Sequence, residues 1–162
     1  MWKQMKKGFT LIELLVVISI IGVLAGLLFT NFSGARERAR DIKRKSDLQQ
    51  VKNALRLYYN DYQQYPADNG GGKISGCGID GTSVCEWGSP FTAGAGQTVY
   101  LNQLPTDPLS TQTYLYTKTN DEIFLLQASL ENLSDDSAVK SQVKCGIPEV
   151  NAVLKVYIVC SE

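Results

Sequence analysis

Residues 6–32 read KKGFTLIELLVVISIIGVLAGLLFTNF, and this segment dominates the organisation of the chain. Two lysines and a glycine stand directly before a long apolar run. Glu13 is the only ionisable residue among the 24 residues from Phe9 to Phe32. A helix of that length measures about 36 Å, which exceeds the roughly 30 Å hydrocarbon core of a bilayer. We therefore predict a membrane-spanning helix over residues 9–32.

Glu13 needs an explanation, because a carboxylate inside a membrane segment is costly and usually functional. One explanation is local. Thr10 and Glu13 have the spacing of a helix capping box, and a glutamate in the first turn also interacts favourably with the helix dipole. The other explanation is that a positive group from a neighbouring chain neutralises the carboxylate. The two explanations are compatible.

The string Gly8-Phe9-Thr10-Leu11-Ile12-Glu13 resembles the processing signature of type IV pilins and of type II secretion pseudopilins. The resemblance implies that a membrane peptidase removes residues 1–8, cutting after Gly8 on the cytoplasmic side, and methylates the new amine of Phe9. It also implies that Glu13 sets the registry between subunits of a helical filament. Pairing of Glu13 with the Phe9 amine of a neighbour would remove two uncompensated charges from an apolar layer.

Three further features of the apolar run and its flanks bear on this reading. Gly22 and Gly26 form a G-x-x-x-G pair, which lets membrane helices approach closely, although glycine is common in such helices in any case. Ser33-Gly34-Ala35 could serve as a secretory cleavage site, but the apolar run is too long for an ordinary signal peptide. Basic residues flank the run on both sides, so their count alone does not favour a cytoplasmic N-terminus.

The helix is predicted to continue beyond the membrane segment. Neither proline nor glycine interrupts the chain between Leu48 and Tyr65, and the apolar residues there recur in steps of three and four. They are Leu48, Val51, Leu55, Tyr58 and Tyr62. This spacing predicts an amphipathic continuation over residues 33–65, giving one continuous helix from about Phe9 to Gln64.

Residues 66–162 are predicted to form a globular head. Glycines crowd the region from Gly70 to Gly96, which we interpret as loop. Tyr114–Lys118 and Glu122–Leu130 flank a short turn and read as a hairpin, and Val150–Cys160 reads as a further strand. We expect an α+β fold, in which a long N-terminal helix packs on one antiparallel sheet of three or four strands. The family resemblance implies the same pilin-like plan.

Within the head, Tyr65-Pro66 and the segment Leu104-Pro105-Thr106-Asp107-Pro108 resemble the pattern of the major pseudopilins. Two departures stand out. Leu109 occupies a place where a tryptophan often follows, and an acidic segment, residues 131–136, replaces the family's glycine- and aspartate-rich calcium loop. Calcium ligands would have to come from Asp121, Asp135 or Asp136. The alternative is a solvated acidic loop without any cofactor.

Four cysteines indicate an exported head. Cys77 and Cys85 lie within the glycine-rich region, while Cys145 and Cys160 bracket the final strand. Of the three possible connectivities, the sequential one closes the shortest loops, so we predict disulfides Cys77–Cys85 and Cys145–Cys160. Four free thiols are the alternative. Zinc is disfavoured, because no histidine or C-x-x-C pattern accompanies the cysteines.

The charge distribution is uneven although the net charge is zero. Residues 36–47 carry six basic and three acidic residues, a net of +3, whereas the chain from Leu48 onward carries seven basic and twelve acidic residues, a net of −5. The basic collar, residues 36–47, could contact lipid headgroups or an adjacent head, or could simply be a solvated helix surface. The acidic head lacks the positive field that nucleic-acid binding requires.

The sequence predicts a structural protein, because it contains no histidine and no recognisable catalytic pattern. We expect a homo-oligomeric filament subunit, processed by the prepilin peptidase and polymerised by assembly machinery in the cytoplasmic membrane. The subunit would cross that membrane once, with the N-terminus cytoplasmic and the head outside. Two alternatives remain open: a minor subunit with an adhesive or ligand-binding head, and a tethered binding domain that never polymerises. Pilus and secretion pseudopilus are not distinguished.

Overall fold

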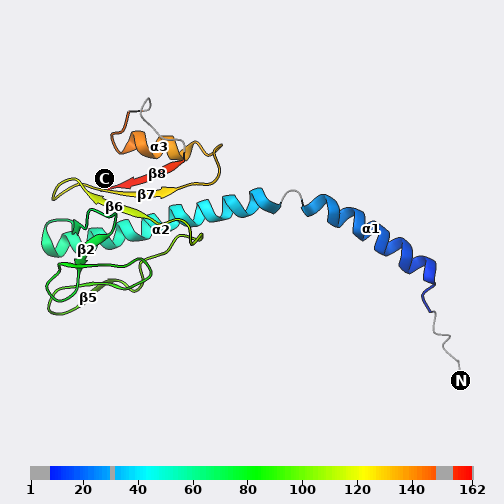
Figure 1. Cartoon of the computed structure of the whole chain (residues 1–162), viewed down its shortest axis with the longest axis horizontal. Helices are drawn as coiled ribbons and strands as arrows, with labels where there is room; N and C mark the ends of the chain where they lie inside the picture. The colour runs from blue at the N-terminus through cyan, green and yellow to red at the C-terminus, as the bar shows by residue number, and fades with distance from the viewer. Residues whose placement is uncertain (1–7, 30–31, 149–154, 162) are drawn as a thin grey trace, which may run out of the picture. The chain divides into compact units, whose positions relative to one another are not determined.

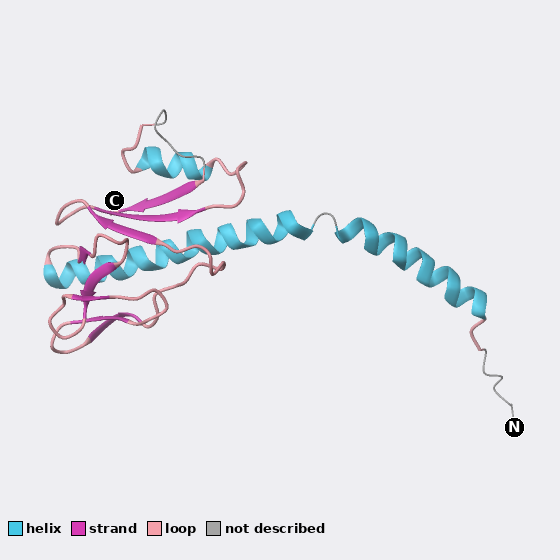
Figure 2. Cartoon of the chain, in the orientation of Figure 1, coloured by secondary structure: helices cyan, strands magenta, loops and turns pink. Residues whose placement is uncertain are grey.

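The computed structural model of the chain describes residues 8–29, 32–148 and 155–161 (Figure 1). Contacts between residues divide the chain into two units, residues 1–36 and residues 37–162. The first unit contains helix α1, and the second contains most of helix α2 and all of the head. Each is described by itself. The layout is α+β and pilin-like, as predicted: long N-terminal helices precede several small antiparallel sheets (Figure 2).

Helix α1 spans Leu11–Phe29. It is apolar on every side, and each large apolar side chain between Leu11 and Leu24 is at least 48% exposed. In the described part of the chain, no helix is long and apolar enough to cross a membrane. The span predicted over residues 9–32 includes residues 30 and 31, which lie outside the described residues.

Helix α2 spans Phe32–Tyr62 and ends close to the predicted point. Gln63 adopts a positive φ of 55° and donates a backbone hydrogen bond to Tyr59, which closes the last turn before Pro66. The predicted apolar stripe is confirmed for Leu48, Val51, Leu55 and Tyr58, which are buried and belong to the main core, but not for Tyr62, which is 38% exposed. The continuous helix predicted from Phe9 to Gln64 appears as α1 and α2, and residues 30–31 between them are outside the described part.

The glycine-rich region and its immediate flanks, residues 67–101, contain five short strands, so the interpretation of this part of the chain as loop was wrong. Strands β1 (Ala67–Asp68), β2 (Ile74–Cys77) and β3 (Ser83–Val84) form one antiparallel sheet, and β4 (Phe91–Ala93) pairs with β5 (Thr98–Leu101) in another. Gly78, at φ 82°, accepts backbone hydrogen bonds from Gly81 and Gly94. A residue with a side chain would be strained at that angle, so glycine here builds tight turns between strands.

The third sheet has the order β6-β7-β8, with β6 at Leu115–Lys118, β7 at Phe124–Ser129 and β8 at Val156–Cys160. The predicted hairpin is confirmed as β6 and β7. Phe124, Leu126 and Ala128 of β7 point into the core, as the alternation predicted. Residues 150–154 of the predicted last strand are not described, Lys155 lies in a turn, and strand β8 begins at Val156. The expected single sheet is replaced by three small ones.

Helix α3, Ser137–Lys144, was not predicted. It contacts β8 and buries Ala138 and Gln142 (Figure 1). Both predicted disulfides, Cys77–Cys85 and Cys145–Cys160, are present, and the described residues include no free cysteine. The second disulfide joins the end of α3 to the last residue of β8.

Candidate functional site

The N-terminal candidate site begins at Gly8 and Phe9, both exposed directly before α1. Thr10 and Glu13 form the predicted capping box: the Thr10 N–H and Oγ1 both donate to Glu13 Oε2, at 2.9 and 2.8 Å. The Glu13 N–H in turn donates to Thr10 Oγ1 at 3.3 Å. The carboxylate of a single chain is therefore bonded at the start of the helix.

The predicted helix-packing positions Gly22 and Gly26 lie within α1. A Cβ placed on either glycine would meet no atom within 4 Å. No described residue of the chain fills the space beside these glycines, which leaves room for the backbone of a second helix. Their proposed role in assembly stays a prediction.

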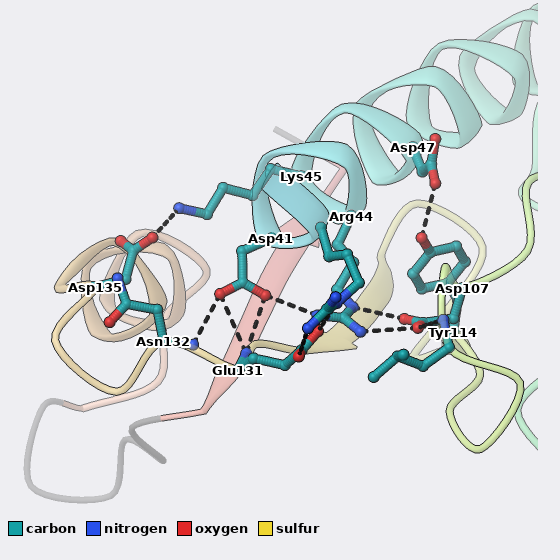
Figure 3. Close-up of polar contacts among 11 residues, drawn as sticks. Asp41, Arg44, Lys45, Asp47, Asp107, Tyr114, Glu131, Asn132 and Asp135 are labelled. Carbon is teal, nitrogen blue, oxygen red and sulfur yellow. Dashed lines mark hydrogen bonds and ion pairs between the residues drawn. The ribbon is translucent and has the colours of Figure 1, made fainter. Parts of the chain in front are cut away.

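A second set of functional residues lies on α2, where a buried arginine joins three acidic side chains (Figure 3). Arg44 is fully buried and donates through Nε and Nη2 to both oxygens of Asp107, at 2.7 and 2.9 Å. Its Nη1 donates to Asp41 at 2.7 Å and to Glu131 at 2.6 Å. We call Asp41, Arg44, Asp107 and Glu131 the charged clasp.

Asp41 adds backbone contacts to the charged clasp. Its carboxylate accepts hydrogen bonds from the backbone N–H of Glu131, at 2.9 and 3.1 Å, and from that of Asn132, at 2.8 Å. Asp107 likewise accepts from the N–H of Leu109 at 2.8 Å. The charged clasp thus fixes two distant loops, the Asp-Pro segment and the loop after β7, against the same turn of α2 (Figure 3).

Flanking cations extend this arrangement. Arg40 donates through Nε to Glu131 at 2.7 Å, and Lys45 pairs with Asp135. Hydrogen bonds from Arg40, supported by Arg44, lower the pKa of Glu131 to about 2. Hydrogen bonding to Lys45 lowers the pKa of Asp135 to about 2. The pKa of Arg44 is raised, chiefly by its bonds to Asp107.

The charged clasp corrects part of the interpretation of residues 36–47 as a basic collar that contacts lipid headgroups or an adjacent head, or is simply solvated. Arg36, Arg38 and Lys43 of the collar are exposed. Asp41 and Arg44 are buried, Arg40 and Lys45 are half-buried, and all four pair within the head or along α2. The sequence contained a signal for this. Asp41 and Arg44 continue the stripe of Leu48 backwards in steps of three and four, so they lie on the buried face.

Asp47 makes a further buried contact next to the charged clasp. The Tyr114 hydroxyl donates to Asp47 at 2.7 Å, and burial raises the pKa of Tyr114. The ring of Tyr114 meets the indole of Trp87 edge-on, with centroids 5.7 Å apart. This tyrosine belongs to the predicted hairpin segment, but its bond to α2 was not foreseen.

The three candidate calcium ligands do not converge. Asp121 pairs with Lys118, Asp135 with Lys45 and Asp136 with Lys140. Within the described residues, no group of three or more histidine, cysteine, aspartate or glutamate side chains is placed to hold a metal ion.

The N-terminal candidate site matches a known family model. Residues 3–29 match the family model described as the prokaryotic N-terminal methylation motif, a range that includes Gly8, Phe9 and Glu13. The chain is 37% identical to type II secretion system core protein G of Escherichia coli K12 over 103 residues, covering 64% of this chain and 66% of that protein. For the Aeromonas hydrophila protein of the same name the identity is 34% over 108 residues, covering 67% and 71%. The chain belongs to the type II secretion core protein G family.

A more distant member of the core protein G family, from Vibrio cholerae, is 31% identical over 122 residues, covering 74% of this chain and 77% of that protein. No solved structure matches the chain. The resemblance to pseudopilins is thus confirmed at the level of the family. The matches do not test the roles of individual residues, so cleavage after Gly8 and pairing by Glu13 stay predictions.

Proposed function

We propose that the protein is a structural filament subunit of a type II secretion system, polymerised through its N-terminal apolar helix. One observation carries the proposal: α1 leaves its apolar side chains exposed on every side, directly after the Gly8-Phe9 junction. Burying exposed apolar surface gains about 25 cal/mol per Å², so such a helix requires lipid or other helices around it.

In this proposal, a membrane peptidase cuts after Gly8 and methylates Phe9, which becomes the first residue of the processed subunit. The subunit waits in the cytoplasmic membrane with its N-terminus inside and its head outside. Assembly machinery in that membrane then moves α1 from lipid into a bundle of identical helices. Gly22 and Gly26 permit close helix approach there, and the names of the relatives favour a secretion filament over a pilus.

Glu13 has two successive roles in this proposal, one before assembly and one during it. In the waiting subunit its carboxylate is capped by Thr10, at the distances given above. During assembly the carboxylate pairs with the Phe9 amine of a neighbour. This pairing lowers the free energy because the amine no longer lies unpaired in an apolar layer, where a lone charge is costly.

Two substitutions separate these roles. Glu13→Val removes both the capping group and the counter-ion, whereas Thr10→Val removes the side-chain cap and keeps the carboxylate. We expect Glu13→Val to lower the yield of sheared filaments at least tenfold at matched membrane levels, with leader cleavage intact. Thr10→Val should retain most of the yield. If both variants lose filament yield equally, Glu13 acts only as a helix cap. If Glu13→Val gives the wild-type yield of filaments, the pairing with the Phe9 amine is refuted.

We propose that Asp121, Asp135 and Asp136 form no calcium site, because each carboxylate pairs with a lysine. A head that also binds a surface or ligand, as in a minor subunit, finds no specific support in the described residues. The structural role accounts for the exposed α1 without any catalytic group, and we propose no enzymatic activity.

A further inference from the structure

Strand β8 lies at one edge of the third sheet, and α3 covers that edge (Figure 1). The Gln142 side chain, which is buried, donates to the Val156 carbonyl at 2.6 Å. The Ile158 N–H donates to Ser141 Oγ at 2.9 Å. These two helix side chains thus satisfy main-chain groups of β8 that β7 leaves unpaired. An edge strand with free main-chain groups is a template for pairing with another chain, and α3 blocks this one.

Among the described contacts, few besides a disulfide hold α3 in place. The helix has eight residues, too few to be stable by itself in water, and it buries only Ala138 and Gln142. Its C-terminal end is tied to β8 by Cys145–Cys160, and the segment just before its first turn is tied to α2 by the Lys45–Asp135 pair. Of the described contacts to β8, cutting the disulfide would leave the side-chain hydrogen bonds of Ser141 and Gln142 and the buried Ala138.

The same disulfide is open to reagents. A cavity of about 260 Å³ lies between α2, α3 and β8, and both Cys145 and Cys160 line it together with Lys140 and Lys144. Ammonium groups nearby favour thiolates. Cys160 is buried at 7% exposure, but its partner Cys145 is half-buried, whereas both cysteines of the other disulfide are buried, Cys77 at 8% and Cys85 at 2% exposure. The two disulfides therefore differ in their access to a reductant.

We propose that Cys145–Cys160 is a redox latch, whose reduction by a dithiol releases α3 and opens β8 to strand pairing with a second copy of this chain. One thiolate of the dithiol attacks the more exposed sulfur, Cys145 Sγ, and Cys160 leaves as a thiolate that takes up a proton. The second thiol of the reagent then displaces Cys145 as a thiol, and the dithiol becomes a cyclic disulfide.

The residues of β8 indicate which partner would pair with its exposed edge. Residues 156–160 read VYIVC, with β-branched and aromatic residues and without proline or charge. Two such strands can pair antiparallel about Ile158 without opposing like charges, using the groups that Ser141 and Gln142 now occupy. In an oxidising compartment the latch keeps the edge covered, so that subunits meet only through their intended surfaces.

The test compares two double variants of the full chain in detergent, Cys145→Ser with Cys160→Ser against Cys77→Ser with Cys85→Ser. The second pair is the matched control, because it removes a disulfide remote from α3. We expect amide exchange of Ile158 to become at least tenfold faster in the first variant in dilute protein. At higher concentration its protection should return as a dimer forms. The control should behave as the wild type in both respects.

Wild-type protein reduced with dithiothreitol after folding, and then alkylated, provides the same measurement if the first variant fails to fold. Unchanged Ile158 exchange after the latch is opened would overturn the proposal, since α3 would then be held without the disulfide. Faster exchange in a chain that stays no more dimeric than the control would overturn the second copy as occupant. Equal effects from both disulfides would show general loosening of the head and would also refute the latch.

Discussion

Replacing Arg44 with methionine is the sharpest test of the charged clasp. Methionine fills similar space but removes four hydrogen bonds, two to Asp107 and one each to Asp41 and Glu131. The acidic partners stay behind, and the side chains of Asp41 and Asp107 are at most 2% exposed. Breaking a buried ion pair by removing one partner costs about 3–5 kcal/mol. We expect a loss of that size in the free energy of unfolding, out of about 5–15 kcal/mol for an ordinary domain.

Urea unfolding of the full chain in detergent measures this loss. Fluorescence of Trp87 is a suitable signal, because its indole packs on Tyr114 beside the charged clasp. Lys43→Met is the matched control, since Lys43 lies on the same helix one residue away and is exposed. A surface change of this kind usually alters stability by no more than about 0.5 kcal/mol. Arg44→Lys should fall between the two, because an ammonium group keeps the charge but cannot bind Asp107 in the bidentate manner.

A loss of less than about 1 kcal/mol in Arg44→Met would refute this reasoning. The charged clasp would then contribute little net stability. In some proteins a whole buried group of ion pairs can be exchanged for hydrophobic residues without loss of stability. Replacing Asp41, Arg44, Asp107 and Glu131 together by apolar residues would distinguish these cases, because it leaves no uncompensated charge.

Two further predictions concern pH and calcium. Glu131 and Asp135 have pKa values lowered to about 2, so the stability they contribute is present above their ordinary pKa of about 4 and is lost as the pH falls towards 2. Glu131→Gln should weaken this acid dependence in thermal unfolding scans, and an unchanged pH profile would contradict the pairing. Because Asp135 and Asp136 are paired with lysines, excess calcium or a chelator should shift the melting temperature by less than about 1 °C. A rise of several degrees with calcium would instead establish a metal site.

The parts of the fold that were predicted correctly depend on local patterns. The stripe from Leu48 to Tyr58 repeats with the period of a helix, and the β6–β7 hairpin alternates around a short turn. The disulfides followed from the small spacing between paired cysteines, 8 residues for Cys77–Cys85 and 15 for Cys145–Cys160. Each of these features is determined by residues close together in the chain, so the sequence alone was sufficient.

The parts that were missed depend on distant residues. Arg44 is 63 residues from Asp107 and 87 from Glu131, and no spacing rule connects them. The short strands β1 to β5 have two to four residues each, which is too few for an alternating pattern to be recognised. Helix α3 was not predicted, because its apolar face is too small to give a recognisable helical pattern. In a lone sequence, charged residues such as Arg44 read as solvent-exposed until a tertiary partner is known.

Glu13 combines an observed local role with the distant role that we propose for it. The capping box supplies the lone chain with hydrogen bonds to the carboxylate from the main chain and the hydroxyl of Thr10. Such bonds lower the cost of keeping a charge in an apolar helix, but they leave its negative charge uncompensated. A neighbouring amine can neutralise that charge. The capped state is therefore a suitable resting state, because it keeps the helix start intact without removing the electrostatic gain that a second subunit brings.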